Sequence, residues 1–379
     1  MTTVYLVRHA EAEGNLYRRA QGHFNGEVTP MGEKQIEALT ERFRDIPLDA
    51  VYSSDLARAH KTALGVAAPT GLPVTTMREL REINLGVWEN KPFGELEADE
   101  AEAMHNFTRD PDKWSVKGGE SFPALTERIT AALLELAKRH DGGTIAVVSH
   151  GMAIRSLLCR ALGLPGSDHQ TVRHGDNTNV SLLHVEGDNI SVEYFNDNSH
   201  LPEEISTFAR QLWWKAHADS DRGNLRFVSL NPAKEPELYT DSYRDAWVAS
   251  HGTDEGFVPD VYLKSAKKHA KETPSSLVKA MRGDKFSGIV ELDIHRGEEV
   301  GSGWITLLYL VSSARRRNLG VQLLGYAVIL FREMGRKSIR LHVSEDNTQA
   351  IAFYKRAGFK MIGVDEGVLA RLYLMEKSI

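Results

Sequence analysis

The chain has 379 residues, a formal net charge of −6 at pH 7 and a single cysteine, so two domains are expected. The mild negative charge offers no electrostatic basis for binding nucleic acid or an anionic membrane, and one cysteine excludes a disulfide framework. No apolar run approaches the roughly 20 residues that span a bilayer and the N-terminus lacks the features of a signal peptide, so we expect a cytoplasmic protein.

Strands and helices alternate over the first half of the chain. Apolar runs of strand length occur at residues 4–7, 50–53 and 145–149, and residues 180–185 and 190–195 read as an antiparallel pair. Helical stripes follow a cap at Thr29 and Pro30 and another cap at Ser121, and Cys159 lies in a third helical stretch as a small core residue. This order predicts an α/β three-layer sandwich with a mostly parallel sheet.

Two of these strands each deliver a histidine at the carboxyl end, where open α/β sheets gather ligands. His9 follows the first strand and His150 follows the run at 145–149. Phosphoryl transfer through histidine needs a nucleophilic imidazole in a fixed tautomer, cations for the phosphate oxygens and an acid for the leaving alcohol. The candidates for these roles are His9 as nucleophile, Arg8 and Arg58 as a guanidinium clamp, His150 as a further positive charge when protonated, and Glu82 as acid.

Five motifs occur in a fixed order around these residues, at 7–10, 53–59, 80–89, 118–121 and 149–151. Together they make residues 4–201 resemble the histidine phosphatase superfamily, also called phosphoglycerate-mutase-like, although Ala10 replaces the glycine of its opening motif. The resemblance implies a catalytic set of His9, Glu82, Arg8, Arg58 and His150. It also implies that phosphate is bound by Arg8, Asn15, Gln21, Gly22, Arg58, His150 and Gly151.

Mutases of this superfamily carry an extra segment before the 118–121 motif, with basic residues that hold the acidic product. Here the segment 90–117 is short and rich in Glu and Asp. This favours a hydrolase that releases phosphate to water, and a phosphoglycerate-type mutase is the alternative.

The sequence pattern changes near residue 200. A short helix carrying Trp213 and Trp214 precedes a polar stretch at 218–223. We therefore predict a first domain at 1–201, a linker with a short helix at 202–223, and a second domain at 224–379. In the second domain, strands at 276–281 and 286–294 flank a hairpin turn, and further strands and helices predict an α+β mixed sheet.

A second chemical signature lies in a loop between an apolar strand at 304–311 and a helix at 321–334. Backbone N–H groups at a helix N-terminus bind pyrophosphate, and a splayed strand before it can pair with pantetheine. The layout resembles the GNAT N-acetyltransferase superfamily, with Asn318 replacing the first loop glycine in a geometry that Asn tolerates. The resemblance implies acetyl-CoA contacts from Leu310, Val311, Arg315, Arg316, Arg317, Asn318, Leu319, Gly320 and Asn347.

In that superfamily a tyrosine protonates the departing thiolate, which implies this role for Tyr354. The base is open between Glu291, on a central strand, and ordered water. We thus predict a bifunctional enzyme that acts on a small-molecule phosphoester and transfers acetyl from acetyl-CoA to an amine acceptor, without a metal. A non-catalytic CoA-binding or regulatory module is the alternative for the second domain, and the sequence leaves open whether the chain forms a homo-oligomer.

Overall fold

The computed structural model describes residues 1–166, 168, 171–211 and 223–379. The chain divides into two compact units, residues 1–220 and 221–379, which are treated separately below. Among the described residues, no helix combines the length and the apolar character needed to cross a membrane. The predicted helix with Trp213 and Trp214 and most of the polar stretch at 218–223 lie outside the described residues.

The first unit is built on a six-stranded sheet in the order β3-β2-β4-β1-β5-β6. The first four of these strands are parallel, and β5 and β6 form an antiparallel extension. The strands are β1 (Thr2–Arg8), β2 (Ala50–Ser54), β3 (Val74–Met77), β4 (Thr144–Ser149), β5 (Val180–Glu186) and β6 (Asn189–Asp197). The predicted mostly parallel α/β sandwich is confirmed.

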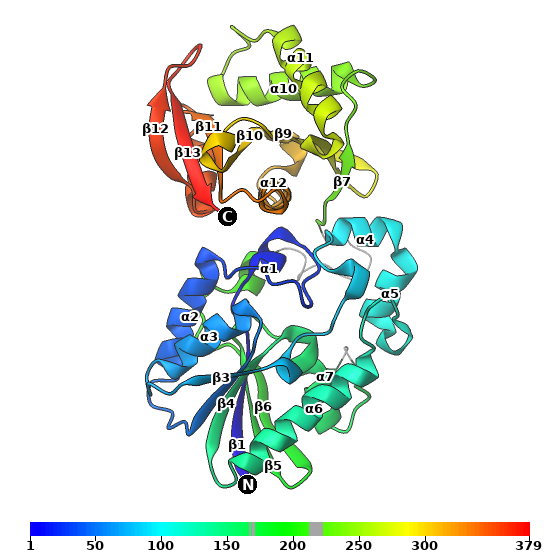
Figure 1. Ribbon diagram of the computed structural model, residues 1–379, viewed down its shortest axis with the longest axis vertical. Coiled ribbons are helices and arrows are strands. Elements are labelled where there is room, and N and C mark those ends of the chain that lie inside the picture. Colours follow the sequence, from blue (N-terminus) through cyan, green and yellow to red (C-terminus); the bar gives the residue numbers. More distant parts are fainter. Residues whose placement is uncertain (167, 169–170, 212–222) are drawn as a thin grey trace. The chain divides into compact units, whose positions relative to one another are not determined.

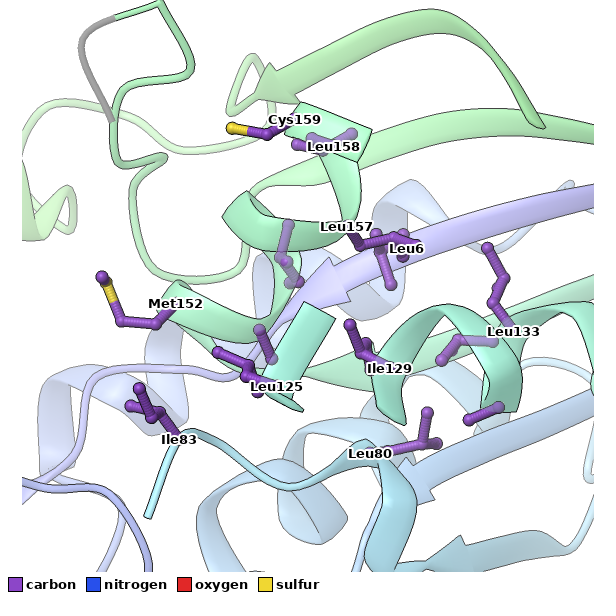
Figure 2. Packing of buried hydrophobic residues seen from close by; sticks show 14 of the residues in the cluster. Leu6, Leu80, Ile83, Leu125, Ile129, Leu133, Met152, Leu157, Leu158 and Cys159 are labelled. Carbon is purple, nitrogen blue, oxygen red and sulfur yellow. The ribbon is translucent and has the colours of Figure 1, made fainter. Parts of the chain in front are cut away.

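Helices cover both faces of this sheet, as Figure 1 shows. On one face α6 and α7 bury Leu125, Ile129 and Leu157 against Leu6 and Val147, a cluster seen in Figure 2 that also contains the fully buried Cys159. On the other face α2 and α3 pack onto the alternate strand residues, including Val7 and Val148. The helices of the unit are α1 (Glu13–Tyr17), α2 (Pro30–Arg42), α3 (Ala57–Ala67), α4 (Phe93–Asp99), α5 (Ala101–Arg109), α6 (Phe122–Arg139), α7 (Gly151–Ala161) and α8 (Thr207–Arg210), with 3-10 turns η1 (Arg78–Leu80), η2 (Gly86–Trp88) and η3 (Pro111–Lys113).

The described part of the predicted linker, residues 202–211, is tied into the first unit by hydrogen bonds. Ser206 Oγ donates to Asp176 at 2.6 Å, and Gln35 Nε2 donates to the carbonyl of Ile205 at 2.8 Å. Gln211 Nε2 reaches the carbonyl of Asn15 at 3.3 Å. These contacts attach α8 to the body of the unit, and the domain boundaries predicted from the sequence stay predictions.

The second unit contains a seven-stranded mixed sheet in the order β12-β13-β11-β10-β9-β8-β7. Its strands are β7 (Arg226–Ser229), β8 (Leu277–Arg282), β9 (Lys285–Asp293), β10 (Ser302–Leu310), β11 (Ser338–Ser344), β12 (Lys360–Asp365) and β13 (Leu372–Ser378). Its helices are α10 (Pro236–His251), α11 (Pro259–Glu272), α12 (Gly320–Glu333) and α13 (Thr348–Arg356), with 3-10 turns η4 (Pro274–Ser276), η5 (Glu298–Val300) and η6 (Ser312–Ala314). The predicted hairpin is formed by β8 and β9.

The two central parallel strands of this sheet, β10 and β11, separate partway along their length. They pair only from Ser302 with Ser338 to Ile305 with Leu341. Beyond that point β10 pairs with β9 alone and β11 with β13 alone. The backbone of β10 after Ile305 is therefore left without its parallel neighbour, which is the splay that the sequence analysis expects beside the loop at 315–320.

Candidate active sites

The register of the first sheet brings the two sequence-predicted histidines together. Arg8 pairs with Ser149 at the ends of β1 and β4, so His9 and His150 follow neighbouring strand ends. Their ring centroids are 5.1 Å apart. Both rings are buried, with 4% and 0% of their surface exposed, which places them at the carboxyl edge of the sheet where ligands are expected.

A local hydrogen bond determines the tautomer of His9. Its Nδ1 lies 2.7 Å from the carbonyl oxygen of Ala10. Because a carbonyl only accepts, this contact assigns the ring proton to Nδ1 and leaves Nε2 unprotonated. Burial, together with the charges of Arg58 and Arg8, holds the pKa of His9 well below 6.5. The ring is thus neutral at physiological pH, as a nucleophile must be.

Two buried guanidinium groups lie beside these rings. Arg8 is 8% exposed and Arg58 fully buried, and the Nε atom of each has no hydrogen-bond partner among the described residues. Burial lowers the pKa of Arg58 to about 10, so it still carries its charge at pH 7. A buried cation with an unused donor is costly unless an anion satisfies it, which favours a phosphate-binding role for both arginines.

His150, which is predicted to add a positive charge only when protonated, lies in surroundings that favour its neutral form. Burial, then Arg58 and His9, hold the pKa of His150 well below 6.5. Neither ring nitrogen has a hydrogen-bond partner among the described residues. His150 is therefore a neutral ring with one N–H to donate, and a phosphate dianion placed against it would favour its protonation.

Glu82, the predicted acid, is held at the N-terminus of α7. Its carboxylate accepts backbone N–H groups from Ile83, Met152 and Ala153, each at 3.0 Å. The side chain therefore also caps the helix that follows His150. It is 7% exposed, which keeps it at the edge of the same buried site, and its acid role stays a prediction.

The other residues predicted to bind phosphate differ in whether their polar atoms already have hydrogen-bond partners within the protein. Gln21 Oε1 accepts from the backbone N–H of Gly14, whereas its buried Nε2 has no partner among the described residues. Asn15 Oδ1 accepts from the backbone N–H of Ala12. Gly151 opens α7, and a Cβ built on it would come 3.5 Å from Arg8 Nε. The N–H of Gly22 is bound to Glu89 at 3.2 Å, so that amide is committed within the protein.

Sequence reasoning missed several residues that hold this site in place. Thr62 accepts the N–H of Ala10 and donates to the carbonyl of Arg58, at 2.9 and 2.7 Å. Asn177 Nδ2 donates to the carbonyl of His9 at 2.9 Å. These are single polar residues without a motif of their own. Only one of these contacts could have been anticipated: Arg58 and Thr62 are four residues apart, so a helix places both on the same face.

The second unit presents backbone groups at the loop before α12. Arg316 and Asn318 both adopt left-handed conformations, with φ of 60° and 57°. Alternating left-handed residues turn successive N–H groups inward to form an anion nest. The backbone N–H groups of residues 316–319 have no hydrogen-bond partner among the described residues. The left-handed geometry expected for Asn318 is confirmed, and Arg316 shares it.

Two of the side chains predicted to contact CoA, those of Arg315 and Asn347, have structural partners. Arg315 donates from Nε to the carbonyl of Leu310 at 2.8 Å and forms an ion pair with Asp245 at 2.6 Å. Asn347 caps α13 through the N–H of Ala350. Arg315 therefore anchors the loop to β10 and α10. Gly320 allows close packing, since a Cβ there would approach the ring of Phe353 within 3.3 Å.

The proton-transfer candidates of this unit are both buried. Burial raises the pKa of Tyr354 above its ordinary value, so the phenol keeps its proton at physiological pH, and its role as the donor to the thiolate stays a prediction. Glu291 is fully buried and accepts from Tyr239 Oη at 2.7 Å and from His269 Nδ1 at 2.8 Å. Glu291 thus ties α10 and α11 to the sheet, and because it is 0% exposed it has no surface from which to take a proton from an amine.

These observations define a two-unit protein with a histidine-centred candidate anion site in the first unit and a candidate backbone anion nest in the second. Residues 4–198 match the model of the histidine phosphatase superfamily, branch 1, and residues 237–359 match that of the acetyltransferase (GNAT) family. Since the first match covers more than half of the chain, the protein belongs to the histidine phosphatase superfamily, and its second unit contains a GNAT domain.

Two curated relatives resemble the first unit. The chain is 32% identical over 203 residues to phosphoserine phosphatase 1 of Hydrogenobacter thermophilus, covering 54% of this chain and 96% of that protein. It is 36% identical over 173 residues to the probable phosphoglycerate mutase GpmB of Yersinia pestis, covering 46% and 80%. The solved structure of Bacillus stearothermophilus YhfR aligns with a TM-score of 0.51 at 30% identity, covering 53% and 99%.

Proposed function

We propose that the first unit hydrolyses a phosphomonoester through a phosphohistidine. Nε2 of His9 bonds to phosphorus as the ester P–O bond breaks, and Glu82 gives its proton to the leaving alcohol. Water then attacks phosphorus, the P–N bond breaks, and Glu82 recovers a proton from that water. Arg8, Arg58 and the N–H of His150 hold the phosphoryl oxygens, where charge gathers.

The observation that carries this proposal is the fixed tautomer of His9. The bond from Nδ1 to Ala10 directs the lone pair to Nε2 without any further side chain. The unpartnered donors of Arg8, Arg58 and His150 supply what a phosphoryl group would satisfy. This combination supports phosphoryl transfer, and it is equally compatible with a hydrolase and with a mutase that moves the phosphoryl group to another oxygen.

The preference for hydrolysis rests on the segment between the acid and residue 118. Of the three lysines in this segment, Lys91 pairs with Glu95 and Glu100, and Lys113 pairs with Asp110, so these two are balanced locally by carboxylates. The name of one relative makes phosphoserine the first substrate to test, and that of the other makes phosphoglycerate the second. We expect stoichiometric orthophosphate from a phosphomonoester and no isomeric phosphoester by ³¹P NMR. An isomeric product would identify a mutase.

We further propose that the second unit transfers acetyl from acetyl-CoA to an amine. The free N–H groups at 316–319 would hold the pyrophosphate, and β10 beyond Ile305 would pair with pantetheine. Tyr354 would protonate the departing thiolate. Because the side chain of Glu291 has no surface exposed to an incoming amine, we assign removal of the amine proton to water.

A measurement of acetyl-CoA consumption across a panel of amines tests this second activity. Binding without turnover, seen as a rise in melting temperature with acetyl-CoA but no free thiol released, would favour a CoA-binding module over an enzyme. If millimolar acetyl-CoA produces no rise in melting temperature and no turnover, the proposal is refuted.

A further inference from the structure

Glu89 lies in a cage of backbone N–H groups next to the phosphatase site. Its Oε1 accepts from His23 at 2.7 Å and from Leu85 at 2.9 Å. Its Oε2 accepts from Phe24 at 2.7 Å and from Gly22 at 3.2 Å. Four donors converge on this one carboxylate, and three of them belong to consecutive residues of a single loop.

The same loop is held from its other side by a predicted phosphate ligand. Arg58 donates to the carbonyl of Phe24 at 3.0 Å and to that of Gly22 at 2.7 Å. The loop at 22–24 thus has its N–H groups on Glu89 and its carbonyl groups on Arg58. These bonds fix two of the guanidinium nitrogens of Arg58, which orients the Nε that has no partner among the described residues.

The acid-bearing segment belongs to the same assembly. Leu85, three residues after Glu82, is one of the four donors to Glu89, and His23 Nε2 lies 3.0 Å from the carbonyl oxygen of Glu82. The loop approaches this segment closely, because a Cβ on Gly22 would lie 2.3 Å from the carbonyl oxygen of Ile83. Only glycine fits there.

We propose that Glu89 is a positioning residue of the phosphatase, which fixes the orientation of Arg58 relative to the acid segment by clamping the loop at 22–24. This inference rests on the proposed function of the first unit. It explains why a carboxylate is placed near an anion site: its charge is enclosed by backbone donors and faces a buried guanidinium that needs a counter-charge.

Glu89→Gln in the full-length chain tests this role. Whichever way the amide is turned, its NH₂ faces two of the four N–H donors, so the loop loses half of its clamp. We expect the inhibition constant of orthophosphate to rise about tenfold and kcat/KM to fall about ten- to hundredfold, as displaced catalytic groups cause. The matched control is Glu95→Gln, which removes a carboxylate of the neighbouring helix paired only loosely with Lys91, and we expect it to behave as wild type.

A double-mutant cycle with Arg58→Ala separates positioning from general destabilisation. If Glu89 acts through Arg58, the double variant should bind orthophosphate no more weakly than Arg58→Ala alone. Effects that multiply would overturn the proposal, as would a folded Glu89→Gln protein with unchanged orthophosphate inhibition. If Glu89→Gln does not fold, Glu89→Asp, which keeps the charge but retracts it by one methylene, carries the same test and the same two outcomes.

Failure of the proposed function gives a different result. In that case wild-type protein releases no phosphate from any ester. The affinities of wild type, the two single variants and the double variant for orthovanadate are then measured by calorimetry in place of turnover. Loss of orthovanadate affinity in Glu89→Gln, absent in the Arg58→Ala background, would support the positioning role even then. Unchanged affinity would refute it independently of catalysis.

Discussion

The candidate anion-binding groups are side chains in the first unit and backbone N–H groups in the second. In the first unit these are side chains: His9 and His150 follow adjacent strand ends, and Arg8, Arg58 and His150 carry nitrogens with no hydrogen-bond partner among the described residues. In the second, the side chains of Arg315 and Asn347 are engaged in structural bonds, and the backbone at 316–319 remains open. The two motifs therefore differ in kind: the side chains of the first are themselves the candidates for ligand contact, whereas those of Arg315 and Asn347 shape the backbone around the candidate site.

This difference predicts that the first site is broken by changing one side chain. His9→Ala should reduce phosphate release by more than about 10⁴-fold, because no other group can take the phosphoryl covalently. Wild-type protein quenched after brief exposure to a labelled phosphoester should carry a label that is lost in mild acid and kept in alkali, as a phosphoramidate is.

The variant also tests whether the two sites are independent. Acetyl-CoA should raise the melting temperature of His9→Ala as much as that of wild type. Substantial turnover by His9→Ala, or an adduct stable to acid, would contradict the covalent mechanism. Loss of acetyl-CoA binding in this variant would show coupling between the units.

The second prediction concerns Glu82, which is both a helix cap and the proposed acid. Glu82→Gln should slow hydrolysis of alkyl phosphates by about 10²–10⁴-fold and of aryl phosphates much less, because a phenolate leaves without a proton. The loss of the cap bonds to α7 lowers the stability of the protein, and this reduces the rate of hydrolysis for every substrate alike. Only the ratio of alkyl to aryl rates, measured by steady-state kinetics, reports the acid role, and equal losses would leave Glu82 as a cap alone.

The sequence predicted the fold of both units and the proximity of His9 and His150, because both rest on regular patterns. Strand–helix alternation specifies the parallel sheet, and parallel register then brings His9 beside His150 without further information. What it could not predict were contacts with no period or motif. The carbonyl of Ala10 that selects the tautomer and the cage around Glu89 depend on the path of the backbone. The neutral state of His150 depends on burial by residues distant in sequence.

The backbone site was less predictable for a related reason. The sequence correctly indicated a left-handed Asn318, but a similar geometry at Arg316 has no residue signal, since arginine rarely adopts it. The pairing of Arg315 with Asp245 joins residues 70 positions apart, and only the fold brings them together. The role of Arg315 as an anchor for the loop could therefore be assigned only from the structure.

The third prediction tests the backbone site through conformation instead of chemistry. Asn318→Val puts a β-branched residue at φ 57°, which costs about 1–2 kcal/mol and should weaken acetyl-CoA binding about 5- to 30-fold. Asn318→Gly, which lacks the amide but accepts the geometry, should bind within about twofold of wild type by calorimetry. Equal loss in both variants would show that the Asn318 side chain itself contacts the ligand.

The smallest expected effect is a difference in how the stability contributions of two histidines, the half-buried His200 of the first unit and the buried His269 of the second, respond to acid. Burial and Arg42 lower the pKa of His200 to about 4, whereas its unfolded value is near 6.5. The unfolded chain thus binds this proton first, so the contribution of His200 to stability is complete above pH 6.5 and is lost as the pH falls towards 4. The slope is at most about 1.4 kcal/mol per pH unit.

His269 in the second unit should show the opposite sign. Its hydrogen bond to Glu291 raises its pKa, so its contribution is complete below pH 6.5 and is lost as the pH rises through the folded value. Urea unfolding of the full chain at pH 7 and 5.5, with hydrogen exchange to assign each transition to a unit, checks both residues. Between pH 7 and pH 5.5, His200→Gln should reduce the fall in the unfolding free energy of the first unit. His269→Gln should remove a rise in the unfolding free energy of the second unit. The same direction of change in both variants would mean that the two histidines do not differ in electrostatic environment as their contacts indicate.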